Sequence, residues 1–362
     1  MAQHGSDTWV IGLGEARTAA VLEDVSINEF AWEAIQPALR EAGVELRQVT
    51  GAVTASQDFW DGRTISSMNV NEVACGSLGS EAKVAADGVQ ALGYAAARIA
   101  DGDQHLNVVV AHAKESEGDA HTIELAAFDP YFERPLNPDD TLVAAFQAQA
   151  LYRTGAASPE EAARVVVAAR SRSEVLAAAA VEDVLSSPLT AEPLRELDRA
   201  PRMNAACALV VCDDAKRNEL ERPAVRVVAT ASRAGAYWRE RADLTDMTPA
   251  SAALHDALDQ AGWALGDIEL IEIAAPFAFQ HLMIAAALGL GAGEQLVARF
   301  ERGEVNASGG WLAGSAESVA GLHAVVFAAR KLRAGEARRA LVHATTGIAA
   351  QSHHVALLES AA

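Results

Sequence analysis

Three stretches in the last third of the chain carry residue types that could do chemistry. The run Asn306-Ala307-Ser308-Gly309-Gly310 places two glycines after a serine, so its backbone N–H groups could bind an oxyanion or cradle a ligand. A structural tight turn explains this run equally well. Ser315 and Glu317 follow closely, and the Glu317 carboxylate could act as a general base, unless these residues belong to a plain surface loop. His281 could also serve as a base, although a lone helical histidine is more often structural or solvated.

The cysteines add little to this set of candidates. Cys75, Cys207 and Cys212 form neither a disulfide framework nor a paired metal-ligand spacing, so the sequence predicts no metal site and a reducing, cytoplasmic location. Cys75 lies in Cys75-Gly76-Ser77, which mimics a nucleophile motif, but we interpret it as a buried or loop thiol. Cys207 and Cys212 fall in an apolar run and are expected to be small core residues.

Charge and hydropathy exclude several classes of partner. The chain has 29 Lys and Arg against 49 Asp and Glu, a formal net charge of −20. This balance argues against binding to nucleic acid or to anionic membrane surfaces, and a polyanionic ligand would need a local cluster of basic residues. No apolar run reaches membrane-spanning length, and Met1–Asp7 shows no signal-peptide pattern.

The elements that must position these residues come in two copies. Val84–Glu115 is an Ala-rich helix, a Gly stop and a short apolar run, and Ser318–Gly347 repeats this order. Gly88 aligns with Gly321, and Ala111 with Ala344. Small residues on every face predict buried helices, and the apolar runs that follow predict interior strands. Two such copies indicate a duplicated fold.

A second helix–strand unit is also repeated. Ser26–Gly43 and Thr248–Gly262 each read as a helix that ends in glycine, with a kink or break expected at Pro37. Each helix is followed by a predicted strand, at Val49–Ala55 and at Ile268–Ala275. Both elements of the repeat therefore occur in the same order in each half.

The remaining segments complete the predicted domain organisation. Trp9–Gly14 reads as a first strand, since its glycines lack the rest of a dinucleotide-binding motif. We predict an N-terminal half at residues 1–125 plus 202–215, a helical loop insertion at 126–201 and a C-terminal half at 224–362. The insertion contains two expected helices, at Thr141–Arg153 and from Ser158 to about Arg172. Lys216–Pro223 is expected to be a polar linker.

This duplicated βαβαβαββ organisation resembles the thiolase superfamily, and most of all its lipid-transfer or sterol-carrier-type branch. The resemblance covers nearly the whole chain. Its most specific parts are Ile99–Glu115, the approach from Pro193 to Ala205–Val211, and Asn306–Gly310, which looks like the family's Asn-Xaa-Ser-Gly-Gly loop. It implies an α/β thiolase-like fold, a five-layer αβαβα sandwich with two five-stranded sheets, and Claisen-type chemistry on acyl-CoA thioesters.

The chemical groups that the family uses are missing from the matching positions. Ala85 stands where the nucleophilic cysteine is expected, and Ala274 where the second-half histidine is expected. The Gly-His-Pro loop falls near Gly314-Ser315-Ala316, which has no histidine, and the C-terminal glycine loop at Thr345–Ala350 has no cysteine. The resemblance therefore implies a chain without ordinary thiolase activity.

Three functions are compatible with this pattern. The first is a thiolase-like subunit of a heteromeric acyl-CoA complex, partnered by a catalytically complete thiolase homologue and by a small OB-fold/zinc-ribbon protein, or built on a homodimer core. The second is a cysteine-independent retro-aldolase that cleaves a β-hydroxyacyl-CoA with Glu317, His281 and the Asn306–Gly310 loop, and the loop holding Ser315 is part of that candidate site. The third is simple acyl-CoA or lipid binding. In each case a coenzyme A thioester is the expected ligand, and no other cofactor is expected.

Overall fold

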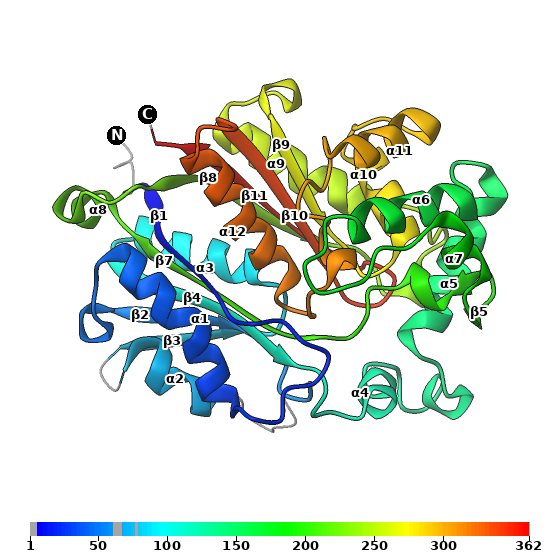
Figure 1. Ribbon diagram of the computed structural model, residues 1–362, viewed down its shortest axis with the longest axis horizontal. Coiled ribbons are helices and arrows are strands. Elements are labelled where there is room, and N and C mark those ends of the chain that lie inside the picture. Colours follow the sequence, from blue (N-terminus) through cyan, green and yellow to red (C-terminus); the bar gives the residue numbers. More distant parts are fainter. Residues whose placement is uncertain (1–5, 61–66, 77–78, 362) are drawn as a thin grey trace.

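Figure 1 shows the computed structural model of the chain, in which residues 6–60, 67–76 and 79–361 are described. Its strands are β1 (Thr8–Glu15), β2 (Gly51–Ala55), β3 (Ser80–Val84), β4 (Leu106–Lys114), β5 (Leu189–Ala191), β6 (Leu194–Arg195), β7 (Asn204–Cys212), β8 (Val225–Ala234), β9 (Leu270–Ala274), β10 (Arg339–Thr346) and β11 (Ser352–Ser360). Its helices are α1 (Ile27–Ala42), α2 (Ser67–Cys75), α3 (Gly88–Ala100), α4 (Ala120–Ala126), α5 (Asp140–Thr154), α6 (Pro159–Arg170), α7 (Val181–Ser186), α8 (Asp214–Leu220), α9 (Thr248–Ala261), α10 (Ala278–Ala287), α11 (Gly293–Arg302) and α12 (Ala320–Arg333).

The strands of the two halves meet edge to edge. Within the described residues the large sheet has the order β3-β2-β4-β7-β1-β8-β11-β10-β9. The first half contributes β3-β2-β4-β7-β1, in which β2 is parallel to β3 and β4 while β7 is antiparallel to β4 and β1. The second half contributes β8-β11-β10-β9, and β1 pairs with β8 between the halves. Residues 202–215 were assigned to the N-terminal half, and the pairing of β7 with β4 and β1 agrees with that assignment.

The second half shows four strands in the described residues where we predicted five. The segment that reaches the free edge of β9 is the turn at Asn306, whose backbone N–H donates to the carbonyl of Ile271 at 2.9 Å. Asn306 has a φ of 55°, and Gly309 and Gly310 also have positive φ values. Because such dihedrals end an extended run, this segment borders the sheet without continuing it as a strand.

The layers follow the prediction of a five-layer αβαβα sandwich. Helices α3 and α12 lie in the middle, and their small apolar residues pack against the inner faces of both groups of strands in one shared core. Helices α1 and α2 cover the outer face of the first half. Helices α9 and α10 cover the outer face of the second half, together with the helices of the insertion (Figure 1).

The equivalence of the two buried helices is visible in their contacts. A Cβ added at Gly88 would lie 3.2 Å from the Cβ of Ala111, and one added at Gly321 would lie 2.7 Å from the Cβ of Ala344. The residues that the sequence repeat aligns therefore make the same helix-to-strand approach in each half. This close approach is what the small residues of the repeat provide.

The glycines of β1 serve helix packing. A Cβ at Gly12 would lie 2.1 Å from the carbonyl oxygen of Ala38, and one at Gly14 would lie 2.0 Å from that of Ala34. The backbone of α1 therefore rests directly on β1. The expected break at Pro37 is wrong, because α1 continues through it from Ile27 to Ala42 and keeps one buried face on the sheet.

We expect a Gly14→Ala substitution to destabilise the fold by about 2 kcal/mol, because the added methyl group would overpack a backbone contact that no side-chain rotation can relieve. The measurement is the free energy of unfolding in urea. Gly102→Ala is the comparison, since its added Cβ would meet open space and its φ of 77° would cost only local backbone strain. Equal losses in the two variants would contradict this account of the β1–α1 contact.

Two connections differ from their predictions. The segment Lys216–Pro223, expected to be a linker, contains most of α8, whose N-terminus is capped by Asp213. The stretch from Ser187 to Pro201, which the sequence predicts to be an irregular connection, contains the short β5–β6 hairpin and a 3-10 turn at Glu196–Asp198. The predicted insertion also holds α5, α6 and α7, which pack on the second half. Among the helices of the described residues, none has the length and apolar character needed to span a lipid bilayer.

Candidate functional site

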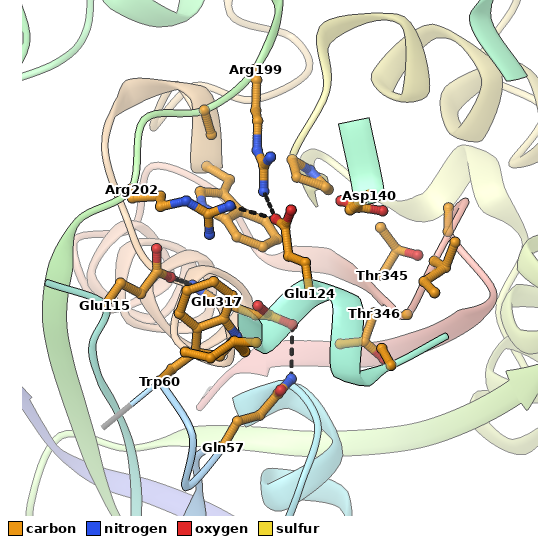
Figure 2. A pocket seen from close by; sticks show the side chains of 18 of the residues that line it. Gln57, Trp60, Glu115, Glu124, Asp140, Arg199, Arg202, Glu317, Thr345 and Thr346 are labelled. Atoms are coloured by element: carbon orange, nitrogen blue, oxygen red, sulfur yellow. Dashed lines mark hydrogen bonds and ion pairs between the residues drawn. The ribbon is translucent and has the colours of Figure 1, made fainter. Parts of the chain in front are cut away.

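A cavity of about 350 Å³ lies where the two halves and the insertion meet. Its wall is formed by the segment before α3, the segment before α12, the end of β4, the β10–β11 loop and residues of the insertion. Ala85 and Glu317 come from the first two of these segments, and Figure 2 shows the polar side chains that point into the same space. The cavity therefore adjoins the N-terminal ends of both buried helices.

Two glutamates from distant parts of the sequence meet in this cavity. Glu115 directly follows β4, and Glu317 precedes α12. The Oε1 atom of Glu115 accepts a hydrogen bond from the backbone N–H of Glu317 at 2.6 Å. The side chain of Gln57 donates to Oε1 of Glu317 at 2.7 Å (Figure 2). This arrangement fixes two carboxyl groups in the wall of one cavity.

Burial changes the protonation of this pair. Burial and, to a lesser extent, the charge of Glu317 raise the pKa of Glu115 to about 8, although the N–H of Glu317 and the charges of Arg202 and Arg199 oppose the rise. Burial also raises the pKa of Glu317, against the hydrogen bond from Gln57. Glu115 is therefore largely protonated at neutral pH and can donate a proton.

The cavity also contains two cations that share one carboxylate. Glu124 of α4 accepts hydrogen bonds from Arg199, at 2.8 Å, and from Arg202 (Figure 2). Burial disfavours the charge of Glu124, but the two arginines outweigh it and lower the pKa of this group. The guanidinium of Arg202 also lies 4.6 Å from the centre of the Trp60 ring. The arginines are thus held in place, and α4 is held against them.

The position of the expected nucleophile lies in this wall but has no reactive group. Ala85 lines the cavity, and of the described residues neither a cysteine nor a histidine does so. Cys75 is buried at the end of α2, with its sulfur 2.8 Å from Oδ1 of Asn71, and burial raises its thiol pKa. Cys207 and Cys212 are buried in β7, and burial raises their pKa values as well. The site therefore offers carboxyl chemistry and no thiolate.

Strained backbone is found at the cavity. Ser318, directly after Glu317, has a φ of 66°, and Ala349 and Ala350 of the β10–β11 loop have values of 55° and 52°. Non-glycine residues rarely adopt this left-handed conformation, and such strain gathers at functional sites. Here it occurs directly after Glu317 and in the β10–β11 loop.

His281 and Ser315 lie outside the cavity wall, among the residues described. His281 is buried in α10, with Nδ1 3.1 Å from the carbonyl oxygen of Phe277 and its ring edge-on to Phe300. Ser315 is buried, and its hydroxyl pairs with Nδ1 of His323 at 2.9 Å. Of the three predicted catalytic residues, the structure brings Glu317 alone into the cavity.

The Asn306–Gly310 loop lies against β9, and its polar groups have internal partners. The side chain of Asn306 accepts from the backbone N–H of Ile273 at 2.6 Å and donates to its carbonyl at 3.0 Å. The N–H of Ser308 donates to Glu272, and the N–H of Gly310 donates to the Ser308 hydroxyl. These contacts fit the structural-turn alternative, and a ligand role for Asn306, Ser308, Gly309 and Gly310 stays a prediction.

Sequence reasoning missed most of the polar wall. Glu115 was recognised only as the end of a motif. Asp140 ends the Pro-rich segment Phe128–Asp140, whose composition predicts a loop, and Arg199 and Arg202 fall in or beside Ser187–Pro201, which was expected to be irregular. One signal was available for Glu115, because a charged residue directly after a buried strand often faces a site at the edge of a sheet. The arginines carry no such signal, since their partner Glu124 is far away in the sequence.

Comparison with known proteins agrees with this architecture. Residues 231–360 match the family model described as thiolase C-terminal domain-like. An acetyl-CoA acetyltransferase of Methanothermobacter thermautotrophicus is 31% identical over 110 residues, which is 30% of this chain and 29% of that protein. The matched segment therefore spans less than a third of this curated relative.

Solved structures resemble the chain over almost its full length. The structure titled "Ltp2-ChsH2(DUF35) aldolase" has a TM-score of 0.82 at 21% identity and covers 99% of each chain. Human mitochondrial 3-ketoacyl-CoA thiolase has a TM-score of 0.80 at 14% identity, again covering 99% of each chain. A monomeric SCP2-thiolase like protein of Mycobacterium smegmatis has a TM-score of 0.75 at 19% identity and covers 98% of this chain and 78% of that one.

The chain therefore has the thiolase fold. Its C-terminal part, residues 231–360, matches the thiolase C-terminal domain-like model, and the chain as a whole resembles solved structures of thiolases and thiolase-like proteins. The thiolase-like resemblance predicted from the sequence is confirmed for the fold and for the C-terminal part.

Proposed function

We propose that this chain cleaves a carbon–carbon bond of a β-hydroxyacyl-CoA by a retro-aldol reaction that needs no cysteine nucleophile. The observation that carries the proposal is the Glu115–Glu317 pair, which lines the same cavity as Ala85. A retro-aldol cleavage requires a base and a proton donor but no covalent intermediate. The resemblance to a structure titled as an aldolase supports the same reaction class.

In the proposed reaction, the Glu317 carboxylate removes the proton from the β-hydroxyl group of the substrate. The bond between the α- and β-carbons breaks, the β-carbon becomes the carbonyl carbon of an aldehyde or ketone, and the electron pair passes to the α-carbon as a thioester enolate. Protonated Glu115 then gives its proton to the α-carbon, which yields a shorter acyl-CoA. Proton transfer from Glu317 back to Glu115 completes the cycle, so atoms and charge balance.

The cations of the cavity can stabilise the enolate that forms in this reaction. Negative charge develops on the thioester oxygen as the enolate forms, and fixed positive charge in a water-poor site stabilises such a transition state. Arg199 and Arg202 are the cations in the described wall of the cavity, and Glu124 holds both in place. Their charges also act on the Glu115 carboxyl, which places them within electrostatic range of the reacting groups.

We further propose that the chain works in a heteromeric assembly. The structure titled "Ltp2-ChsH2(DUF35) aldolase" bears the names of two components, and this chain resembles it over 99% of its length. The partners we expect remain a small OB-fold/zinc-ribbon protein or a catalytic thiolase homologue, with a homodimer as the alternative core.

A second candidate is a thiolase-like subunit with no chemistry of its own. The observation in its favour is Ala85 at the expected nucleophile position. In that case the cavity would hold an acyl-CoA and a catalytic partner subunit would carry out the reaction. The two candidates make opposite predictions for the chain when it is assayed alone.

The test is to incubate the purified chain, alone and with any copurifying protein, with a panel of β-hydroxyacyl-CoAs and to identify products by mass spectrometry. We expect a shorter acyl-CoA and an equimolar aldehyde or ketone, at the same rate in wild type and in a Cys75→Ala variant. Loss of activity in Cys75→Ala would contradict the cysteine-free mechanism. Activity that appears with a cysteine-bearing thiolase partner, and never without it, would favour the second candidate.

A further inference from the structure

Helix α4 contributes Glu124 to the cavity wall but is not anchored in the core. No residue of α4 is buried, and none belongs to or packs against the buried apolar clusters of the described residues. His121 pairs with Asn137 at 2.9 Å, and the carbonyl of Ala126 accepts from the chain segment that directly follows α4. Among the hydrogen bonds and ion pairs of the described residues, those of Glu124 are what joins α4 to a segment distant in the sequence. An element with so few buried contacts opens at a low cost in free energy.

The two arginines that bind Glu124 have other supports. Arg199 also donates from Nη1 to the hydroxyl of Thr141 at 2.8 Å. The guanidinium of Arg202 lies 4.6 Å from the centre of the Trp60 ring. The side chains of Arg199 and Arg202 line the cavity and are 24% and 30% exposed, so a ligand can reach them. Both arginines would therefore stay in place if Glu124 moved away with α4.

Glu124 occupies the arginine pair incompletely. Its Oε1 atom alone accepts from Nη2 of Arg199, at 2.8 Å, and from Nη2 of Arg202 (Figure 2). Guanidinium groups can bind a carboxylate through both of its oxygens, so one shared oxygen leaves donors unused. The Nε and Nη1 groups of Arg202 have no acceptor among the described residues, and neither is buried. The arginine pair is thus a carboxylate site that holds a side chain of the protein itself.

The other charges near the arginines permit an exchange of this carboxylate. Glu115, Asp140 and Glu317 lie within electrostatic range of both arginines. Burial, against the opposing charges of the arginines, raises the pKa of Asp140 to about 7, so Asp140 and Glu115 both carry less than their full negative charge at neutral pH. A ligand carboxylate that replaces Glu124 exchanges one negative charge for another. The exchange therefore adds no net charge to the cavity and leaves neither arginine without an anion.

We propose that Arg199 and Arg202 bind a carboxylate on the acyl chain of the substrate, and that Glu124 holds this position until the ligand displaces it together with α4. The inference rests on the proposed function insofar as the ligand is an acyl thioester. The ligand carboxylate takes the place of Glu124, so the donors of Arg202 that Glu124 does not use stay available to the enolate. The substrate class is therefore a β-hydroxyacyl-CoA whose acyl chain carries a carboxylate.

The first test is equilibrium binding to the full chain by isothermal titration calorimetry. The probes are glutaryl-, adipoyl- and pimeloyl-CoA, each compared with the acyl-CoA of the same chain length that ends in a methyl group. Because these thioesters lack a β-hydroxyl group, the proposed reaction cannot cleave them. At one or two chain lengths we expect the carboxylate compound to bind about tenfold more tightly, the effect of charge-assisted hydrogen bonds to two guanidinium groups.

A Glu124→Gln variant distinguishes an occupant of the site from a purely structural ion pair. The amide keeps the shape of the side chain but is neutral, so the ligand carboxylate no longer competes with a charge. We expect the carboxylate preference to increase by about a further fivefold, with little change for the methyl-ended compounds. Arg202→Gln should reduce the preference to less than about twofold. Glu294→Gln, which alters the exposed ion pair with Arg164, is the control and should keep the wild-type preference.

Hydrogen–deuterium exchange of the wild type tests the displacement of α4. A bound ligand ordinarily slows exchange in the wall that it contacts. With saturating adipoyl-CoA, or with the carboxylate compound that binds best, we expect peptides from α4 to exchange at least about threefold faster than with the methyl-ended compound of the same length. This measurement needs no variant, so it keeps the inference testable if a substitution impairs folding.

The outcomes separate this inference from the proposed function. Equal affinities at every chain length, or a carboxylate preference that Glu124→Gln fails to increase, would overturn the carboxylate site and leave bond cleavage by Glu115 and Glu317 standing. A preference without faster exchange in α4 would overturn the displacement of Glu124. Failure of all the thioesters to bind would overturn the site and, with it, the acyl-CoA part of the proposed function.

Discussion

A Glu317→Gln variant should cleave its β-hydroxyacyl-CoA substrate at least about 10³-fold more slowly than wild type while its KM changes only a few-fold. The amide has nearly the shape of the carboxylate and can still accept the hydrogen bond from Gln57, so binding and fold should survive. It cannot take up the hydroxyl proton, so the loss should fall on kcat. Steady-state kinetics with the best substrate of the panel measures both constants.

The partner residue should respond differently. Glu115→Gln keeps an oxygen to accept from the N–H of Glu317 but removes the proton donor, so we expect a smaller loss in kcat of about 10²-fold, because water can protonate the enolate in its place. Glu294→Gln, which alters an exposed ion pair with Arg164, is the matched control and should retain wild-type activity. A Glu317→Gln enzyme within tenfold of wild type would remove Glu317 from the mechanism.

The pH dependence gives an independent signature of the same pair. A proton donor acts only while it is protonated, so activity should fall as the pH rises through about 8, the pKa to which burial and the charge of Glu317 raise Glu115. This alkaline limb should disappear in Glu115→Gln and persist in Glu294→Gln. A limb that is unchanged in Glu115→Gln would show that another group supplies the proton.

Much of the fold was predictable because its signals are local and repeated. The Ala-rich helices α3 and α12 and the strands after them could be aligned from the sequence, and Gly88 and Gly321 approach Ala111 and Ala344 in equivalent ways. The missing fifth strand of the second half was not predictable in this way. It depends on the positive φ of Asn306 and on the hydrogen bonds that Asn306 exchanges with Ile271 and Ile273 of β9, which the periodicity of apolar residues does not reveal.

The site was less predictable, because contacts between residues that are distant in the sequence bring its side chains together. Glu317 was found because it lies in a loop that the resemblance had marked. Arg199 and Arg202 matter through their hydrogen bonds with Glu124 of α4. Such pairs join segments that are distant in sequence, so no local pattern identifies them.

The position of the cavity follows from the way the duplication is assembled. Asp87 accepts from the N–H of Val89, at 2.8 Å, in its own helix and from the N–H of Gly321, at 2.9 Å, in the equivalent helix. Its carboxyl is buried, and burial raises its pKa to about 7 against these two hydrogen bonds. One side chain thus joins the N-termini of α3 and α12, which brings Ala85 and Glu317 to a common wall. The duplicated halves supply this frame, and the insertion supplies the polar groups that make the cavity asymmetric.

Acidification should destabilise the protein through histidines buried in the second half. Burial lowers the pKa of His281 from 6.5 to about 4 and that of His354 to about 4, and burial together with the charge of His354 lowers that of His353 to about 3. In the unfolded chain these groups take up protons near pH 6.5, whereas in the folded protein they take up protons only near pH 3 to 4. Their contribution to stability is therefore complete above pH 6.5 and is lost as the pH falls towards 4, by about 3 kcal/mol for His281 alone.

Buried carboxyl groups act in the opposite direction, which is why the test compares variants. Burial raises the pKa values of Asp87, Asp140 and Glu272 to about 7, so these groups disfavour the folded state as the pH rises from about 4 to 7 and relieve that penalty on acidification. The pH dependence of the wild type is the difference between two large effects. A single histidine variant isolates one of them.

We therefore expect the stability advantage of wild type over His281→Leu to shrink by about 2 kcal/mol between pH 7 and pH 5. This magnitude follows because pH 5 lies about 1.5 units below the ordinary histidine pKa, and each unit corresponds to about 1.4 kcal/mol. Urea unfolding at the two pH values measures this difference. His255→Gln is the control, because His255 is exposed. If the gap between wild type and His281→Leu is the same at both pH values, the folded protein accepts a proton at His281 as readily as the unfolded chain does, and the buried neutral histidine is not what limits stability in acid.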